Sequence, residues 1–382
     1  MLQKNKFWLT TILTNSVMKK ILFYTNIPSP YRVDFFNELG KYCELTVLFE
    51  STHSTERDEL WKQYHFDNFE GIIMHGKRTA VDMAFCPEII RHLRAKKYDE
   101  IVITIMASLT SILAVNWLRL HHIPYIYEGD GGFVHAENKM KYLLKHNVIS
   151  HAKYCFSTSV AFDEYCMKYG ALADHIYRYP FTSVWNKDLV AEPLAITEKQ
   201  MLRAQYGMQE EHIMVSVGQM IHRKGFDILL RAAEVLDKSW GIYLVGGQPS
   251  DELRDLVEQL SLENVYFVDF MPKKKLWKYY QAADLFVLPT RDDPWGLVVN
   301  EAMANALPVI TTTRCIAGLE MVENGANGFL YDPEDVDKLK EILTGCTQHE
   351  RQLEKMADAA LQTAKKYTIE EMVEAHRRYM EL

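Results

Sequence analysis

The sequence lacks the features that define several large classes of protein. Its six cysteines are scattered over 382 residues and no two are spaced as CxxC, which excludes the common zinc frameworks and a disulfide-stapled scaffold. It has no run of about 20 apolar residues that would cross a membrane. Positive charge is also scarce, since 43 Lys and Arg face 51 Asp and Glu. The resulting net charge of −8 argues against a dedicated nucleic-acid-binding protein.

What is present is the composition of a folded, globular protein. Hydrophobic residues make up 48% of the chain and charged residues 25%, and the length predicts two or three domains. Scattered cysteines are typical of reduced thiols in a cytoplasmic protein. The stretch 7–17 resembles a short signal-peptide core or a membrane anchor. Because Met18 opens MKKILFYTN, which is typical of a first strand, we interpret residues 1–17 as an extension upstream of the native start.

Short apolar runs alternate with amphipathic segments along the chain. This alternation is typical of a parallel sheet covered by helices on both faces. The fold class is therefore α/β, with two successive doubly wound units and a ligand site in the cleft between them. We predict strands at 21–26, 44–50, 100–106, 124–130 and 152–159, and then at 212–218, 241–247, 265–270, 285–289 and 307–312.

A break in this rhythm divides the chain into domains. Residues 18–180 form the first Rossmann-like domain, and residues 181–209, which contain no strand-like run, form a linker. The second Rossmann-like domain covers residues 210–366. The charged, amphipathic segment 367–382 is predicted to be a helix that crosses back to the first domain.

Basic and glycine-rich loops follow the first two strands of the second unit. The segment VGQMIHRKGF places Arg223 and Lys224 just beyond the strand that ends at Gly218. Two cations there suit an anionic ligand, and arginine can grip a phosphate with two hydrogen bonds. A solvated pair of surface cations fits the spacing equally well. Gly246 and Gly247 end the next strand and suit a close backbone approach to a ligand or a tight turn.

A helix start follows the fourth strand of the second unit. Asp293 and Pro294 look like its N-cap and first helical residue. The free N–H groups of Gly296 and Leu297 would then form a phosphate cradle. Glu301 lies in the apolar stretch LVVNEAMA, which disfavours a solvated position. A simple cap and a surface carboxylate are the alternatives for the two acidic residues.

These motifs occur together and in the order of a known family. The segment 213–343 resembles the retaining glycosyltransferases of family 4, also called group 1 glycosyl transferases. The resemblance rests on the RKG loop, the VGG strand end, AADLFVLPT, two acids separated by seven residues, EAMA…LPVI and GLEMVENGANGFLYDPEDVDKL. It implies the GT-B fold, in which two Rossmann-like domains face a central cleft. It also implies a nucleoside-diphosphate sugar as donor substrate, with no cofactor and no metal.

The resemblance implies a role for each matching residue. Arg223 and Lys224 would bind the donor diphosphate, and Glu301 would hold the ribose hydroxyls. Asp293 would lie beside the donor sugar. The implied donor-binding set is Gly218, Gln219, Arg223, Lys224, Gly246, Gly247, Phe270, Met271, Asp293, Trp295, Gly296, Leu297 and Glu301.

Three positions depart from the family pattern. Asp293 stands where the family has a glutamate, and Asp292 is the neighbour that could compensate for the shorter side chain. Gln219 stands where the family has an arginine, so one diphosphate cation is missing. Ala306 replaces the usual glycine before LPV. These departures leave donor affinity and sugar preference open.

The first domain would bind the acceptor. Tyr31 and Arg32 follow the first strand and could touch an acceptor or a phosphate, although Arg32 is more simply read as an ordinary residue of a first helical turn. YEGDGGF follows a strand, so Glu128 or Asp130 could orient the acceptor hydroxyl or take its proton. The sequence does not decide between these two carboxylates, and a Gly-rich turn without a role is the alternative.

The predicted function is that of a retaining, metal-independent hexosyltransferase. It would move a hexosyl unit from a UDP- or GDP-sugar to a saccharide or polyprenyl-diphosphate-linked acceptor in cell-surface polysaccharide biosynthesis, with Arg223, Lys224 and the helix start near Gly296 holding the charge of the leaving group. The site would lie in the cytoplasm or at the inner face of the membrane. The basic helices 138–154 and 273–280 leave a peripheral membrane contact open. The alternatives are a catalytically weak nucleotide-sugar-binding protein and a nucleotide-sugar epimerase of the same fold.

Overall fold

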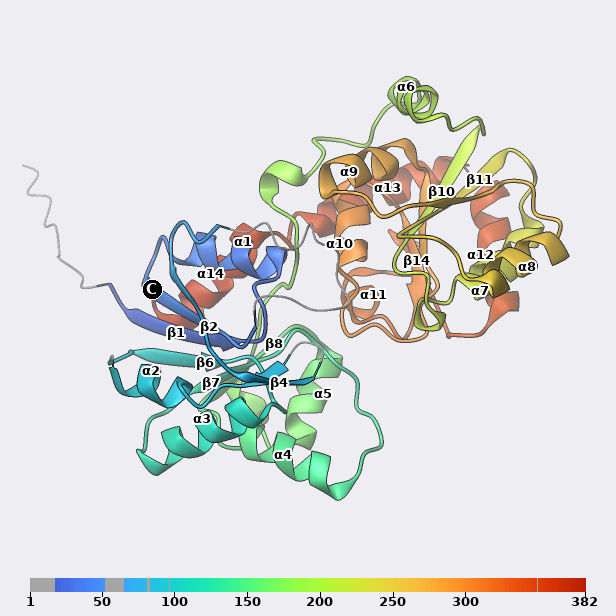
Figure 1. Cartoon of the computed structure of the whole chain (residues 1–382). Helices are drawn as coiled ribbons and strands as arrows, with labels where there is room; N and C mark the ends of the chain where they lie inside the picture. The colour runs from blue at the N-terminus through green and yellow to red at the C-terminus, as the bar shows by residue number, and fades with distance from the viewer. Residues whose placement is uncertain (1–17, 52–64, 81–82, 96, 349) are drawn as a thin grey trace, which may run out of the picture.

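The computed structural model describes residues 18–51, 65–80, 83–95, 97–348 and 350–382, and these form two α/β domains (Figure 1). The interpretation of residues 1–17 lies outside the described part. All six cysteines are buried free thiols.

The N-terminal domain is built on a parallel sheet of seven strands in the order β3-β2-β1-β6-β7-β8-β9. Alternate residues of β1 enter different cores, because Ile21 and Phe23 join one hydrophobic cluster and Leu22 and Tyr24 the other. Both faces of the sheet are therefore buried, as a doubly wound fold requires. The strands are β1 Lys20–Thr25, β2 Glu44–Phe49, β3 Glu70–Ile73, β6 Glu100–Ile103, β7 Ile126–Glu128, β8 Tyr154–Ser157 and β9 Ile176–Arg178. The helices are α1 Pro30–Leu39, α2 Ile89–Ala95, α3 Leu109–Leu120, α4 Lys139–Ile149 and α5 Val160–Lys168.

The C-terminal domain repeats this plan on a parallel sheet in the order β12-β11-β10-β13-β14-β15. Its strands are β10 His212–Val217, β11 Trp240–Val245, β12 Val265–Val268, β13 Leu285–Leu288, β14 Val309–Thr312 and β15 Gly328–Tyr331. Its helices include α7 Phe226–Ala232, α8 Asp251–Gln259, α9 Lys273–Ala282, α10 Leu297–Ala304, α11 Ile316–Met321, α12 Val336–Gln348 and α13 Glu350–Ala364. Helix α6, Ile196–Tyr206, packs on α9.

The chain passes between the domains twice. It leaves the N-terminal domain after β9 and returns as α14, Ile369–Met380, which lies beside α1 (Figure 1). Its Met372 and Val373 are buried in the hydrophobic cluster that also holds Phe35 of α1. The last helix of the sequence therefore completes the core of the first domain.

The predicted strands are all present, whereas several short ones were not predicted. The hairpin of β4 Lys77–Ala80 and β5 Met83–Phe85 carries charged residues, and β9 has only three residues, so neither forms an apolar run. Strands β3 and β15 lie at sheet edges and are partly exposed, which weakens the same signal.

Candidate active site

The two predicted cations meet the acidic loop of the C-terminal domain. They lie on a short 3₁₀ turn, His222–Lys224, between β10 and α7. The Lys224 Nζ donates a 2.5 Å hydrogen bond to Asp293 Oδ2, and Arg223 Nη1 donates one of 2.7 Å to the Asp292 carbonyl oxygen. The side chain of Arg223 remains 41% exposed, and its Nη1 lies 3.9 Å from Asp293 Oδ1. The alternative of two solvated surface cations therefore does not fit Lys224, whose side chain is only 12% exposed.

The expected helix cap at Asp293 is wrong. Helix α10 begins three residues later than its expected first residue, Pro294, and its N-cap is Gly296 with φ 98°. A side chain at this left-handed position would be strained, and its Cβ would lie 2.6 Å from the Cys315 sulfur. Asp293 is instead buried against Lys224. The backbone N–H groups of Gly296 and Leu297 have no hydrogen-bond partner within the described residues, as the start of a helix leaves them.

Glu301 lies one turn into α10 and faces the linker rather than open solvent. Its carboxylate accepts hydrogen bonds from the Ser183 hydroxyl at 3.2 Å and from the Tyr280 hydroxyl at 3.1 Å. Burial raises the pKa of Glu301, and the charge of Lys273 and these two hydroxyl donors oppose the rise. The prediction that Glu301 is not a solvated surface carboxylate agrees with these contacts.

The two glycines after β11 lie where the domain's backbone loops converge. A Cβ on Gly246 would lie 2.0 Å from the Gly218 carbonyl oxygen, so this glycine lets the backbones after β10 and β11 approach each other closely. A Cβ on Gly247 would meet nothing within 4 Å. The other residues of the predicted donor set are split: Gln219 and Phe270 are exposed, whereas Met271 and Trp295 are buried in the core.

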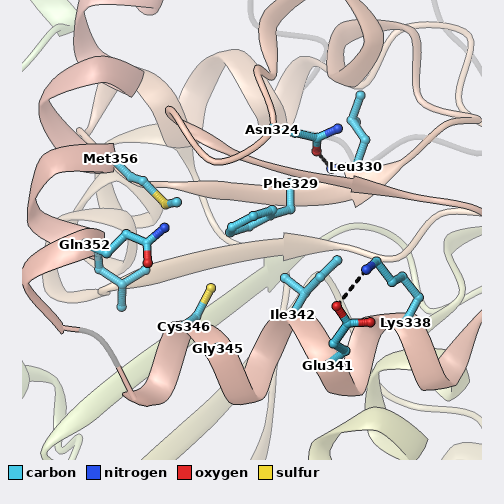
Figure 2. Close-up of a pocket in the computed structure, with 11 residues that line it drawn as sticks. Asn324, Phe329, Leu330, Lys338, Glu341, Ile342, Gly345, Cys346, Gln352 and Met356 are labelled. Carbon is cyan, nitrogen blue, oxygen red and sulfur yellow. Dashed lines mark hydrogen bonds and ion pairs between the residues drawn. The ribbon is translucent and has the colours of Figure 1, made fainter.

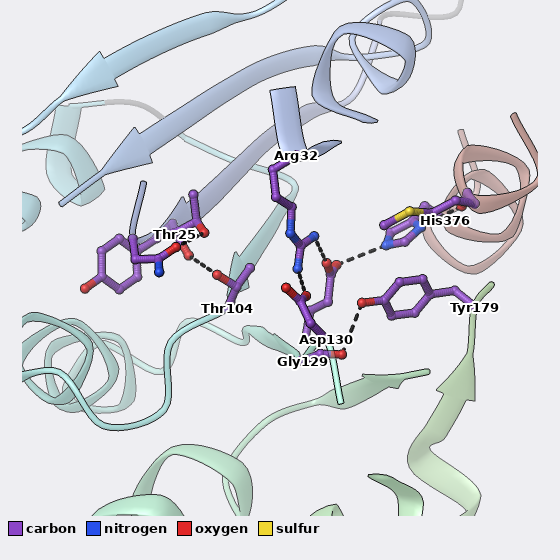
Figure 3. A network of polar contacts seen from close by, with 11 residues as sticks. Thr25, Arg32, Thr104, Gly129, Asp130, Tyr179 and His376 are labelled. Carbon is purple, nitrogen blue, oxygen red and sulfur yellow. Dashed lines mark hydrogen bonds and ion pairs between the residues drawn. The ribbon is translucent and has the colours of Figure 1, made fainter. Parts of the chain in front are cut away.

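Arg32 is the centre of a buried charge cluster in the N-terminal domain (Figure 3). Its Nη1 donates a 2.5 Å hydrogen bond to Glu128 Oε1, and its Nη2 donates to Asp130 Oδ1. Only 3% of Arg32 is exposed. The reading of Arg32 as an ordinary first-turn residue is therefore wrong, because the side chain spans from α1 to the end of β7. Tyr31, its neighbour, is half-buried with its ring edge-on to Phe181.

The cluster separates the two carboxylates that the sequence left equivalent. Glu128 is fully buried, and both of its oxygens accept hydrogen bonds, from Arg32 and from His376 Nε2 at 3.0 Å. Burial would raise the pKa of Glu128, but the charges of Arg32 and His376 and their hydrogen bonds lower it to about 2. The Asp130 side chain is 37% exposed and so can reach a ligand. Burial raises the pKa of Asp130, the charge of Arg32 opposes this, and the charge of Glu128 adds to it.

Sequence reasoning missed His376, which lies 248 residues from its partner Glu128. The signal that could have found it is the amphipathic pattern of α14. That pattern places His376 one turn after Met372, on the buried face of the helix. A polar residue on such a face needs a partner, and a carboxylate at the end of a neighbouring strand supplies one.

Loops of the N-terminal and C-terminal domains touch each other. The Gly131 backbone comes so close to the Pro294 carbonyl oxygen that a Cβ would lie 2.1 Å from it. The Arg314 guanidinium lies 4.0 Å from the centre of the Phe133 ring. The Val160 N–H at the start of α5 donates to Glu320 Oε1 at 2.8 Å. Asp130 and Asp293, each next to one of the touching residues, are thus brought to the same boundary.

A separate pocket of about 370 Å³ lies between α12, α13 and β15 (Figure 2). Phe329, Ile342, Cys346 and Met356 form its apolar lining. None of the predicted site residues lines it. The candidate site therefore lies at the polar contacts between the two domains and not in this pocket.

Helix α4 carries exposed apolar and basic side chains together. Met140 is 67% and Leu143 48% exposed, and Lys139 and Lys141 are exposed beside them. Among the described residues, no helix combines the length and apolar character needed to cross a lipid bilayer. The residues that the structure describes also contain no group of three or more His, Cys, Asp or Glu side chains arranged to hold a metal ion.

Comparison with protein families and curated proteins finds that the C-terminal half is similar to glycosyltransferases. Residues 198–363 match the family described as "Glycosyl transferases group 1". Mannosylfructose-phosphate synthase from Agrobacterium fabrum is 30% identical over 209 residues, which are 51% of this chain and 45% of that protein. An uncharacterized glycosyltransferase from Methanocaldococcus jannaschii is 28% identical over 268 residues, 65% of each chain. The chain spans about half the length of the first of the curated relatives it matches.

Solved structures resemble the whole chain at low sequence identity. HepE from Anabaena in complex with UDP has a TM-score of 0.78 at 18% identity, covering 95% of this chain and 99% of that one. WaaG, a glycosyltransferase involved in lipopolysaccharide biosynthesis, has a TM-score of 0.68 at 15% identity, covering 94% and 99%. These likenesses confirm the predicted architecture of two facing Rossmann-like domains.

Proposed function

We propose that this chain is a retaining hexosyltransferase. The premise is that residues 198–363 form a domain of the group 1 glycosyl transferases within a GT-B fold. Its donor is a nucleoside-diphosphate sugar, and a UDP-sugar is favoured because HepE is described in complexes with UDP and with UDP-glucose. The acceptor is a hydroxyl of a saccharide or of a polyprenyl-diphosphate-linked saccharide. The process is polysaccharide or lipopolysaccharide assembly, as for WaaG.

One observation carries the proposal: the cations of Arg223 and Lys224 lie against the loop that leads into α10. Lys224 Nζ is 2.5 Å from Asp293 Oδ2, and the N–H groups of Gly296 and Leu297 lie at the start of the same helix. Two cations and a helix N-terminus together favour a diphosphate. Glu301, one turn further along α10, is placed to accept hydrogen bonds from hydroxyls, as it does from Ser183 and Tyr280.

The reaction follows from where charge develops. The bond between the anomeric carbon and the diphosphate oxygen breaks, and the acceptor oxygen bonds to that carbon on the same face. Arg223, Lys224 and the start of α10 stabilise the negative charge that grows on the departing diphosphate, which is a large catalytic effect of preorganised charge. Asp130 orients the acceptor hydroxyl and takes its proton, because it is the exposed carboxylate of the N-terminal cluster. In this scheme protein cations supply the counter-charge, so the reaction is expected to be insensitive to EDTA.

The first experiment measures binding of UDP, GDP, ADP and their common sugars by thermal shift, with and without EDTA. A ligand that binds only the folded protein raises the melting temperature by mass action. We expect a selective shift with one nucleotide, unchanged by EDTA. Lys224→Ala is expected to weaken nucleotide affinity about tenfold or more, because it removes a charge-assisted hydrogen bond. Lys274→Ala is the matched control, since Lys274 is an exposed lysine on α9.

The outcomes separate the alternatives. Equal affinity in the Lys224→Ala and Lys274→Ala proteins contradicts the diphosphate site. Selective nucleotide binding without transfer to any saccharide acceptor favours a binding protein. Conversion of the donor sugar in the absence of an acceptor favours an epimerase.

If the acceptor is lipid-linked, the exposed face of α4 would contact the membrane that holds it. Met140 and Leu143 offer apolar surface, and Lys139 and Lys141 offer positive charge beside it. This combination favours peripheral contact with an anionic membrane surface. Co-sedimentation with anionic vesicles, compared with neutral vesicles, tests this part of the proposal. Equal sedimentation with both contradicts it.

A further inference from the structure

His376 is a histidine with no contact to solvent at the end of a chain of charges that reaches the site. Its exposed fraction is 0%, and its ring lies between Phe35 at 4.7 Å, Tyr179 at 4.8 Å and Phe156 at 5.2 Å between ring centres. It comes from α14, the last helix of the sequence, and reaches the carboxyl end of β7 (Figure 3).

Both ring nitrogens of His376 face hydrogen-bond acceptors. Nδ1 lies 2.7 Å from the Met372 carbonyl oxygen, and Nε2 lies 3.0 Å from Glu128 Oε2. A carbonyl can only accept, so Nδ1 carries a proton. Glu128 is held ionised by Arg32, so its carboxylate also only accepts, and Nε2 carries a proton too. This arrangement, with an acceptor oxygen at each ring nitrogen, favours an imidazolium.

This charge balances the cluster. Arg32 and His376 supply two positive charges, and Glu128 and Asp130 supply two negative ones. Glu128 is bound by both cations, whereas Arg32 is the one cation bound to Asp130 in the described part of the chain. The Tyr179 hydroxyl, the remaining titratable group packed on the ring, donates to the Gly129 carbonyl oxygen at 3.1 Å and so contributes no charge.

We propose that His376 is a positioning residue for Asp130: its imidazolium neutralises Glu128, so that Arg32 is left to hold Asp130 ionised and directed at the acceptor hydroxyl. This inference rests on the proposed function of Asp130 in the glycosyl transfer. Without the imidazolium, Arg32 alone faces two carboxylates. Glu128 is the more deeply buried of the two and keeps the guanidinium, so Asp130 binds a proton at a higher pH.

The test is the pH profile of kcat/KM for the acceptor in the His376→Gln protein. Glutamine can donate a hydrogen bond to Glu128 but brings no charge. We expect the acidic limb of the profile to move about one unit toward higher pH. At pH values on the acidic side of that limb, kcat/KM should then be about tenfold lower than in the wild-type protein. His376→Lys, which restores the charge, is expected to return the limb toward its original position. Affinity for UDP should stay within about twofold in both variants, because the donor residues are untouched.

The control removes packing without changing charge. Val373→Ala, also buried on α14, should lower stability while leaving the acidic limb where it is. If the His376→Gln profile superimposes on that of Val373→Ala, His376 only packs and the proposal is overturned.

A direct measurement separates this inference from the proposed function. A ¹⁵N NMR spectrum of the wild-type imidazole at pH 7 should show both nitrogens of His376 protonated, whether or not transfer is observed. A neutral tautomer overturns the inference even if His376→Gln does not fold. Protonated nitrogens together with a wild-type protein that binds no donor would instead overturn the proposed function.

Discussion

Glu128 is a buried carboxylate whose pKa of about 2 makes it a source of stability at neutral pH. Its unperturbed pKa is 4.5, so the unfolded chain binds a proton more readily than the folded protein does. Its contribution is therefore present above about pH 5 and is lost as pH falls toward 2, with a size on the order of 3 kcal/mol. Glu128→Gln should lower the melting temperature at pH 7 and have a progressively smaller effect at pH 4 and pH 3. A deficit that stays constant over this range would contradict the assignment.

Gly246 and Gly247 offer a matched pair of substitutions with different expected costs. Both have positive φ, but only a Cβ on Gly246 would overlap the backbone, at 2.0 Å from the Gly218 carbonyl oxygen. Gly246→Ala should lower the free energy of unfolding by about 1–3 kcal/mol more than Gly247→Ala, because β10 or β11 must shift to make room. Chemical denaturation of both variants measures the difference. Equal losses would mean that backbone conformation, and not the close approach, sets the cost.

For single residues, the sequence predicts that a side chain is not simply solvated better than it predicts which side chain it contacts. Lys224 and Glu301 were singled out by residue type and spacing, and both lie in partly buried polar contacts. The Pro that follows Asp293 predicts a helix cap at Asp293, whereas the left-handed Gly296 delays the start of the helix. Arg32 could not be assigned, because its partners lie 96 and 98 positions away and only the folded chain brings them together.

Helix α14 has an N-cap whose side chain accepts a hydrogen bond from the helix backbone, whereas the N-cap of α8 makes no such bond. The Thr368 side chain accepts a hydrogen bond from the Glu371 N–H at 3.3 Å, whereas the Ser250 side chain makes no such bond at the start of α8. Thr368→Ala should cost about 1 kcal/mol of stability, and Ser250→Ala only a few tenths. Thermal unfolding of both variants measures the contrast. A similar loss in both would show that the modest Thr368 bond contributes little.

Strands buried on both faces are predicted from their apolar runs, and the partly exposed edge strand β12 is predicted as well. The bounds of β10 and β13, which are almost entirely buried, agree with the prediction to within one residue. The β4–β5 hairpin was missed, because a charged two-stranded element has neither an apolar run nor strict alternation.

Over the whole molecule, the Arg314–Phe133 contact is expected to favour the closed arrangement of the two domains. The guanidinium lies 4.0 Å from the ring centre and also donates to Asp292 Oδ1 at 2.6 Å. A cation–π contact contributes about 0.5–2 kcal/mol, so Arg314→Ala should raise the open population about two- to thirtyfold. Small-angle X-ray scattering without ligand should then give a larger radius of gyration than for the control Arg254→Ala, whose side chain is exposed on α8. If the Arg314→Ala and Arg254→Ala proteins scatter identically, the Arg314–Phe133 contact does not favour the closed arrangement.

The return of the chain to the N-terminal domain has a consequence for how the protein is made. A domain usually folds as soon as the ribosome has released its own residues. Here Glu128 is synthesised early, but its partner His376 emerges only after the C-terminal domain. The N-terminal domain therefore waits, with an incomplete core, until the C-terminal domain has been translated. A polypeptide truncated before α14 is expected to be a substrate for chaperones or proteases even though both sheets are complete.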